Sequence, residues 1–179
     1  MIHHRGRPLP EKLTGRILAM CRTGEDPAPL FAFWRRLADN PSQDSVRQLY
    51  DFLENKGIPI STDGMILAYK SVRPNFRDHH SGIIDNSVGQ APRMPRAEVC
   101  ADPATHCAPG LHVGSLQYAI TFGSSVSKIV ICEVDPADVV SRKPASSGSY
   151  DRSGQPRGGY ALGARDAVYR HGSKGRSRH

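Results

Sequence analysis

Cationic and aromatic side chains gather in the middle of the chain, between Ile66 and Tyr118. Guanidinium and ammonium groups bind phosphates and carboxylates, and aromatic faces stack on bases. Glycine and proline interrupt this stretch every few residues, so we expect short strands and tight turns, which often form binding clefts. The sequence therefore predicts a site for an anionic, nucleotide-like ligand, formed by Tyr69, Lys70, Arg73, Arg93, Arg96, His112 and Tyr118.

A second interpretation of the same stretch stays open. Asp78, Asp85 and Glu98 lie among the cations in the sequence and could pair with them as an ordinary solvated surface. Glu98, Glu133 and Asp138 are carboxylates that a catalytic mechanism could use, but no spacing marks any of them. We therefore predict no catalytic residue and expect the site to bind its ligand rather than to react with it.

Histidine and cysteine residues near this stretch do not follow a metal-binding pattern. Cys100 and Cys107 form no C-x-x-C pair, and no second pair follows. A thiol nucleophile such as Cys107 beside His112 has no feature that singles it out. The sequences of P-loop, Rossmann and G-x-S-x-G enzymes are missing as well. The histidines near this stretch are His79, His80, His106 and His112. Because their spacing fits no metal-binding pattern, we predict neither a metal nor a cofactor.

Two helices are predicted at the start of the chain. Apolar residues recur at helical spacing in residues 11–23, and Gly24 then ends the first helix. The same spacing recurs in residues 30–37, where Trp34, the only tryptophan, is expected at the centre of the apolar face.

A third helix is predicted between Asn40 and Gly57. Asn40 is a typical N-cap residue, Pro41 suits the first helical position, and Gly57 suits the position just after the last turn. Together the three segments predict a small helical layer.

After Gly57 the apolar period changes from 3.6 to 2, which is typical of β-strands. Residues 65–72 and 128–134 have the strongest strand patterns, because they are apolar and partly β-branched. Shorter strands are expected at 81–84, 111–113 and 137–141, with one or two helical turns at 115–122.

The positive charge of the chain lies in its last segment. Residues 141–179 hold 9 basic and 2 acidic residues, which equals the net charge of +7 for the whole chain. This segment is rich in Ser, Gly and Arg and poor in apolar residues, so we expect it to be largely flexible, with brief order at 160–169. Its basic residues could make weak contacts with nucleic acid or an anionic membrane.

These patterns predict one α+β domain with three short N-terminal helices packed on a small mixed β-structure. Residues 1–57 form the helical layer, residues 58–141 the β-rich core, and residues 142–179 the flexible basic tail. The first residues show no signal peptide and no apolar run approaches membrane-spanning length, so we expect a soluble protein of a reducing cytoplasm with free thiols.

Two stretches resemble a known family. They are NPSQDSVRQLYDFLENKGIPISTDGMILAYKSVRPNFRDHHSGIIDNSVGQAPRMPRAEV and GLHVGSLQYAITFGSSVSKIVICEVDPADVVS. They resemble the C-terminal domain of the rIIB-like proteins of tailed phages, and the resemblance covers roughly residues 13–141. Longer relatives carry an N-terminal extension that is not seen here, and the basic tail from Arg142 does not resemble theirs.

The resemblance implies a phage early protein, cytoplasmic or membrane-associated, linked to lysis inhibition and to overcoming host or prophage exclusion. It implies no catalytic residues. We therefore expect a phage accessory protein that acts by binding, either to a host defence protein or to a nucleotide-type immune signal. The sequence does not indicate an oligomeric state.

A second resemblance concerns the order of elements. A strand ending in Tyr69-Lys70, a Gly-Leu-His-Val strand, Ser-x-x-Tyr-Ala and a strong strand are similar to ADP-ribosyltransferase-like folds. This resemblance implies an enzyme that uses NAD, as an alternative to the binding function. A nucleic-acid-binding protein acting through the basic tail is a third alternative.

Overall fold

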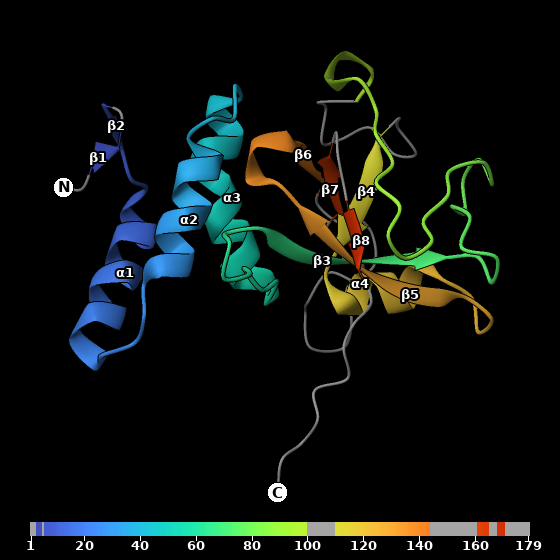
Figure 1. Ribbon diagram of the computed structural model, residues 1–179, viewed down its shortest axis with the longest axis horizontal. Helices are drawn as coiled ribbons and strands as arrows, with labels where there is room; N and C mark the ends of the chain where they lie inside the picture. The colour runs from blue at the N-terminus through green and yellow to red at the C-terminus, as the bar shows by residue number, and fades with distance from the viewer. Residues whose placement is uncertain (1–2, 5, 100–109, 144–160, 165–167, 171–179) are drawn as a thin grey trace, which may run out of the picture.

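The computed structural model describes residues 3–4, 6–99, 110–143, 161–164 and 168–170. Its fold is α+β, as predicted, with three helices grouped at one end of the molecule and an antiparallel sheet at the other (Figure 1). Ahead of the helices, the two-residue strands β1 (His3–His4) and β2 (Arg7–Pro8) pair with each other.

The first two helices have the predicted positions. α1 (Glu11–Thr23) buries Leu13 and Ile17, and it ends at Gly24, whose φ of 76° is left-handed. α2 (Ala28–Leu37) buries Leu30, Phe33, Trp34 and Leu37 on one face. Trp34 is 1% exposed, so its expected place at the centre of the helical layer is confirmed.

The third helix, α3 (Gln43–Lys56), begins differently from the prediction. Its N-cap is Ser42, whose hydroxyl accepts the backbone N–H of Ser45 at 3.2 Å. The prediction that Asn40 caps this helix was wrong, because the Asn40 amide is buried and binds backbone carbonyls about a hundred residues further along the chain. The predicted end is confirmed, since Gly57 has a left-handed φ of 59°.

Six strands form one sheet in the order β6-β7-β4-β3-β5-β8, and every described pairing is antiparallel, which refines the expected mixed structure. β3 (Ile66–Val72) and β5 (Lys128–Val134) lie where the sequence predicts strands and pair along their whole length. β4 (Leu111–Gly114) adjoins the other side of β3.

Part of the expected tail belongs to the sheet. β6 (Val139–Lys143) extends two residues beyond the predicted folded core. β7 (Ala161–Ala164) lies between β6 and β4, and β8 (Val168–Arg170) pairs with β5 at the opposite edge. Both strands lie in or next to the stretch 160–169, where brief order was expected; the other residues after Lys143 lie outside the described residues.

Between β3 and η1 (Arg96–Glu98), one turn of 3₁₀ helix, the chain is irregular. Residues 81–84 form a loop and not the predicted strand, because the Asp78 carboxylate accepts the backbone N–H groups of Ser81, Ile83 and Ile84 at 2.6, 3.1 and 2.9 Å. These amides are therefore not available to a neighbouring strand.

One cluster of buried side chains joins the helical layer to the sheet. On β3 the even-numbered residues Ile66, Ala68 and Val72 face this core, and each is 0% exposed. α3 packs beside β6, and α2 packs beside η2 (Pro136–Asp138). None of the described helices has the length and apolar content needed to cross a membrane.

Candidate functional site

The seven predicted ligand-binding residues lie in two parts of the fold. Five of them belong to the sheet, the residue just after β3, and α4 (Leu116–Phe122), namely Tyr69, Lys70, Arg73, His112 and Tyr118. Arg93 and Arg96 lie in the segment that leads into η1 and begins it. That all seven residues hold one ligand stays a prediction. The hydrogen bonds of these side chains indicate which of their polar atoms already bind other parts of the protein.

Lys70 uses its ammonium group inside the protein. It lies on the core face of β3, between Ala68 and Val72, and its Nζ donates to the backbone carbonyl of His112 at 2.9 Å. Burial lowers the pKa of Lys70 below its ordinary value, and burial raises the pKa of the nearby Cys132 thiol to about 12. Tyr69 points to the opposite face of the sheet, because side chains alternate along a strand.

Arg96 holds the η1 segment against the joint between the helices and the sheet. Its guanidinium donates to the backbone carbonyls of Ala137 and Val139, each at 3.1 Å, and to Asn40 Oδ1 at 3.0 Å. Asn40 Nδ2 in turn donates to the carbonyls of Pro136 and Val139, each at 2.8 Å. These hydrogen bonds direct the Arg96 guanidinium at the protein itself.

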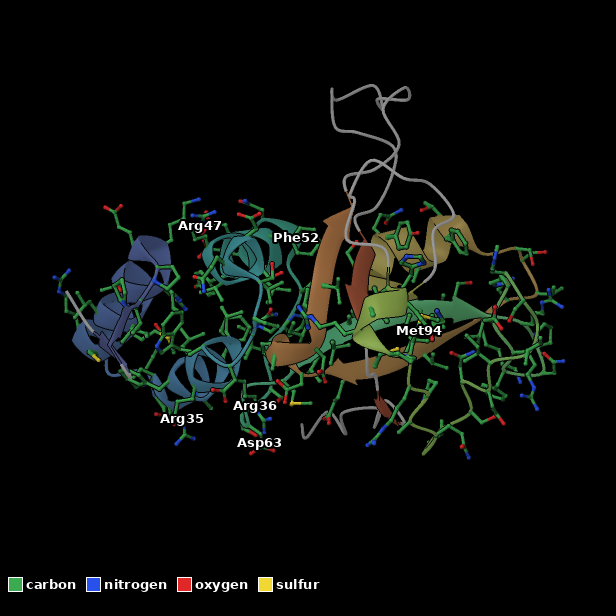
Figure 2. All side chains as sticks on the ribbon, turned by 90° about the horizontal axis from the view of Figure 1, so that it is seen from above. Arg35, Arg36, Arg47, Phe52, Asp63 and Met94 are labelled. Carbon is green, nitrogen blue, oxygen red and sulfur yellow. The ribbon has the colours of Figure 1, made fainter. Side chains whose placement is uncertain are left out.

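A second contact ties the helical layer to the sheet at the same joint. Arg36 donates through Nε to the Asp63 carbonyl at 2.9 Å and pairs through Nη1 with the Asp135 carboxylate at 2.6 Å. Figure 2 shows Arg36 and Asp63 together at this junction. The network of Arg36, Asn40 and Arg96 therefore stabilises the arrangement of the layers.

Three side chains distant in sequence meet where β3 ends. His79 Nε2 lies 3.2 Å from Ser71 Oγ and 3.3 Å from Ser127 Oγ. Arg73 donates to the His79 carbonyl at 2.9 Å, so this predicted residue belongs to the same cluster. Gly123 packs directly against this cluster, since a Cβ on Gly123 would lie 2.3 Å from Ser71 Oγ. The sequence did not point to this cluster.

The His79 cluster lacks the third group that a serine nucleophile requires. A catalytic imidazole is oriented by a carboxylate or similar group on its other nitrogen. No carboxylate in the part of the chain that the structure describes is hydrogen-bonded to the His79 ring. The cluster therefore fits a polar tie that fastens the loop after α4 to the end of β3.

α4 and the loop after it carry aromatic and aliphatic side chains above this cluster. The Phe122 ring lies edge-on to His79, with ring centroids 5.9 Å apart, and tilts against Tyr118 at 5.6 Å. Five large apolar side chains here are 38–67% exposed. We call them the α4 surface: Leu116, Ile120, Phe122, Val126 and Ile129.

His112 packs at the other end of β4. Its imidazole lies beside Gly110 and near Val99, since a Cβ built on Gly110 would approach His112 Nε2 at 3.2 Å and Val99 Cγ1 at 3.4 Å. The structure thus brings Lys70 to the backbone of His112, and Arg73 to the Tyr118 side of the fold through His79 and Phe122.

Asp78 is an acidic side chain with an internal role. Burial raises the pKa of its carboxyl, but hydrogen bonds from Ser81, Ile84 and Gly82 outweigh burial and lower the pKa to about 2. Asp78 is 5% exposed, and its carboxylate shapes the 78–84 loop through these hydrogen bonds.

Among the described residues, no three His, Cys, Asp or Glu side chains gather closely enough to hold a metal ion. Cys132 is buried and Cys21 is exposed. Cys100, His106 and Cys107, which the sequence offered no reason to assign to a metal site or a thiol nucleophile, lie outside the described residues.

Comparisons with known proteins agree on one family. The family model described as "Bacteriophage T4 protein rIIB" matches residues 2–148. The chain is similar to the protein called "Protein rIIB" of Enterobacteria phage T4, with 45% identity over 129 residues. The alignment covers 72% of this chain and 41% of that relative, so the chain spans well under half of the relative's length. No solved structure matches the chain.

Proposed function

Because this chain belongs to the rIIB family of phage proteins, we propose that it is a phage accessory protein that binds a host protein in the host cytoplasm, in counter-defence or lysis regulation. The family gives the biological setting, and the α4 surface supports binding as the mode of action. The partner named here is a protein of host defence or of the lysis machinery.

The observation that carries the proposal is the concentration of exposed apolar side chains on the α4 surface. Nine large apolar side chains are exposed among the described residues, and five of them lie between Leu116 and Ile129. No charged residue occurs from Ser115 to Ser127. Exposed apolar patches on soluble proteins often mark sites where another protein binds, because association removes them from water.

The contacts of the predicted cations support a protein partner over a small anion. The Lys70 ammonium binds a backbone carbonyl inside the fold, and the Arg96 guanidinium binds two carbonyls and Asn40. A phosphate at either position would compete with these internal hydrogen bonds.

The test is photo-crosslinking in infected host cells with a benzophenone amino acid at Ile120, and with the same group at Leu18 of α1 as the matched control. Both residues are exposed apolar side chains on helices, at 54% and 44%. We expect an adduct with one host protein from position 120 only. That protein, once purified, should bind the chain and lose about tenfold or more in affinity with Phe122→Asp. The proposal fails if positions 18 and 120 give the same adducts.

A nucleotide-type immune signal is the second candidate ligand. Arg73 is linked to the Tyr118 ring through His79 and Phe122, and a guanidinium group and an aromatic ring suit a phosphate and a base. A nucleotide present at about a hundred times its dissociation constant would add about 2.7 kcal/mol of stability. Melting curves with cyclic and ADP-ribose-type nucleotides would reveal such a shift, and an unchanged melting temperature would remove this candidate.

The enzyme and nucleic-acid alternatives remain separate predictions. Transfer of label from NAD to host proteins would favour an ADP-ribosyltransferase-like enzyme and contradict the binding proposal. Salt-sensitive binding to DNA or RNA that is lost when tail arginines are replaced by glutamine would favour the nucleic-acid alternative.

A further inference from the structure

We infer that the gap between β4 and β6 is a binding site for an extended protein segment, and that residues 161–164 occupy it from within the same chain as β7. An extended segment of a partner protein with the same apolar pattern can take their place. This gap is distinct from the α4 surface, and its occupancy does not depend on the proposed function.

β7 fills a gap between two strands that both precede it in the chain. It pairs along β4 from Leu111 to Gly114 and along β6 from Val139 to Lys143, antiparallel to both. Among the described strands, β7 is the only one that pairs with β6. If β7 leaves, both walls of the gap present unpaired backbone N–H and C=O groups, and such an edge binds an added strand.

The β6 wall is held by the helical layer. The Val139 carbonyl accepts Asn40 Nδ2 at 2.8 Å and the Arg96 guanidinium at 3.1 Å, and Ser45 Oγ lies 3.5 Å from it. Val139 belongs to the buried cluster, and α3 packs beside β6. None of these contacts involves β7, so we expect this wall to keep its place when β7 leaves.

The β4 wall is held by β3 and by the core. Gly114 pairs with Tyr69, and the Lys70 ammonium donates to the His112 carbonyl at 2.9 Å. Leu111, the first residue of β4, is 1% exposed. The two walls are thus fixed by different parts of the fold, at a separation that admits one strand between them.

β7 is not tied to the gap by a tight turn. Lys143 and Ala161 lie opposite each other in register, yet 17 residues, 144–160, separate them in the chain, whereas a hairpin needs only two. A longer loop costs more entropy to close, so it holds β7 less strongly than a tight turn would. β8 follows β7 after three residues and pairs with β5, so the two strands are expected to attach and leave together.

The family relationship covers the walls and not the strand between them. The family model matches residues 2–148, which include β4 and β6, whereas β7 begins at Ala161. The gap therefore belongs to the family-matched part of the chain, and a segment from beyond that part fills it. Such an occupant is exchangeable in principle, because main-chain groups form the ladder on both sides.

The register specifies the side chains that an occupant needs. Position 162 lies opposite Val113, and position 164 lies opposite both Leu111 and Val139. These three residues are each 1% exposed, and directly opposite residues share a face of the sheet, so positions 162 and 164 are on the core face. Leu162 and Ala164 are apolar, as this face requires. A replacement segment therefore carries apolar residues at two alternate positions.

The test cuts the chain between β6 and β7 after it has folded. A recognition sequence for a specific protease replaces part of residues 144–160, and the purified full chain is then cut. A fluorescent synthetic peptide of residues 159–171 is added, and its binding is followed by anisotropy. We expect the cut protein to bind the peptide in exchange for its own fragment. The uncut chain should bind it at least about tenfold more weakly, because its own strand is tethered at a high effective concentration.

Peptide variants test the required pattern. Leu162→Asp in the peptide should weaken binding about tenfold or more, because it brings a charge to the core face opposite Val113. Leu162→Met is the matched control of similar volume and should bind within about threefold of the unchanged peptide. A peptide library with random residues at positions 161–164, selected on the cut protein, should return apolar residues at 162 and 164. Enrichment of polar residues at either position would contradict the assignment.

Three further results would overturn the inference. One is a cut protein that keeps the Trp34 fluorescence of the folded chain and binds no peptide, or binds a scrambled peptide equally well. Another is loss of the folded-state fluorescence on cutting, because the walls would then not stand without a tethered β7. The third is a concentration-dependent dimer of the uncut chain that the peptide separates, which would assign the occupant to a second copy of the chain.

Discussion

Asn40 connects three parts of the fold through one buried amide. Its Oδ1 accepts from the Ser42 backbone N–H and from Arg96, and its Nδ2 donates to the carbonyls of Pro136 and Val139. The side chain is 0% exposed, so its removal leaves buried polar partners without their hydrogen bonds.

We predict that Asn40→Ala lowers the free energy of unfolding by about 3 kcal/mol, because it leaves several buried polar groups without a partner. Asn75→Ala is the matched control, since the exposed Asn75 accepts only the N–H of Arg77. Asn75→Ala should lower the free energy of unfolding by less than about 1 kcal/mol. Urea denaturation measures both, and equal losses would show that the Asn40 network is not a principal support of the joint.

Lys70 gives a prediction about pH. Its pKa is lowered by burial, so between the folded-state pKa and the ordinary value of 10.5 the unfolded chain binds more protons than the folded chain. Stability from this residue therefore rises with pH in that range, and below it the folded state carries the cost of a buried charge. We expect the wild type to gain stability relative to Lys70→Met as the pH rises from about 7 to about 10. Denaturation at both pH values measures the difference, and a difference that does not change with pH would contradict the burial of the ammonium group.

At the scale of the elements, the turn before β3 touches the backbone of α2. Gly64 has a left-handed φ of 79°, and a Cβ at this position would lie 2.2 Å from the backbone nitrogen of Phe33. The helical layer can approach the sheet this closely only because residue 64 has no side chain.

We predict that Gly64→Ala destabilises the protein by about 3 kcal/mol or more, since two backbone segments would have to move apart. Gly89→Ala is the control, because Gly89 has a φ of 87° but nothing within 4 Å of its added Cβ. Gly89→Ala should lower the free energy of unfolding by about 1 kcal/mol, because only the strained backbone conformation opposes the added Cβ. Similar melting temperatures for the two variants would rule out the close contact.

The C-terminal strands give a second prediction at this scale. β7 lies between β6 and β4, so a chain that stops at Lys143 loses the strand that joins them. We expect this truncation to lower the melting temperature clearly, by several degrees or more, because both neighbours lose their backbone partners. Removal of residues 171–179 alone is the control, since it removes no described strand. If both truncations melt like the full chain, β7 is not a stable part of the sheet.

The helices and the two long strands were predictable because their signals are local. Apolar spacing marked α1, α2 and β5, and the glycines at positions 24 and 57 marked two helix ends. The start of α3 was predicted wrongly because Asn40 binds Pro136 and Val139, which are distant in sequence. Local capping rules contain no information about such a contact.

The candidate site was less predictable, because its contacts are long-range. Ser71, His79 and Ser127 meet across 8 to 48 residues, and nothing in their immediate sequence marks the meeting. The cations were identified from residue type alone, which does not reveal that Lys70 lies on the core face of a strand or that Arg96 binds backbone carbonyls. The alternation of apolar residues along β3 is the signal that could have placed Lys70 inside.

At the scale of the whole molecule, the buried cluster shared by the helices and the sheet makes the helical layer a support for the sheet. The α4 surface lies on the sheet part, beside β3 and β4. The internal networks of Arg36, Asn40 and Arg96 hold the layers together, and the exposed apolar side chains of α4 remain available to a partner. Stability and binding are therefore expected to depend on different residues.

The most direct measurement of this separation is complementation of a phage that lacks this gene, on a host that restricts it, with plasmids that supply the chain. We predict that Phe122→Asp lowers the plaque count by about tenfold or more relative to the wild type, because a charge at the centre of an interface commonly abolishes binding. Leu18→Asp, at an exposed apolar position of α1, should complement fully, and both purified variants should melt near the wild-type temperature since both side chains are exposed. Full complementation by a folded Phe122→Asp protein would contradict the claim that this family member works through its α4 surface.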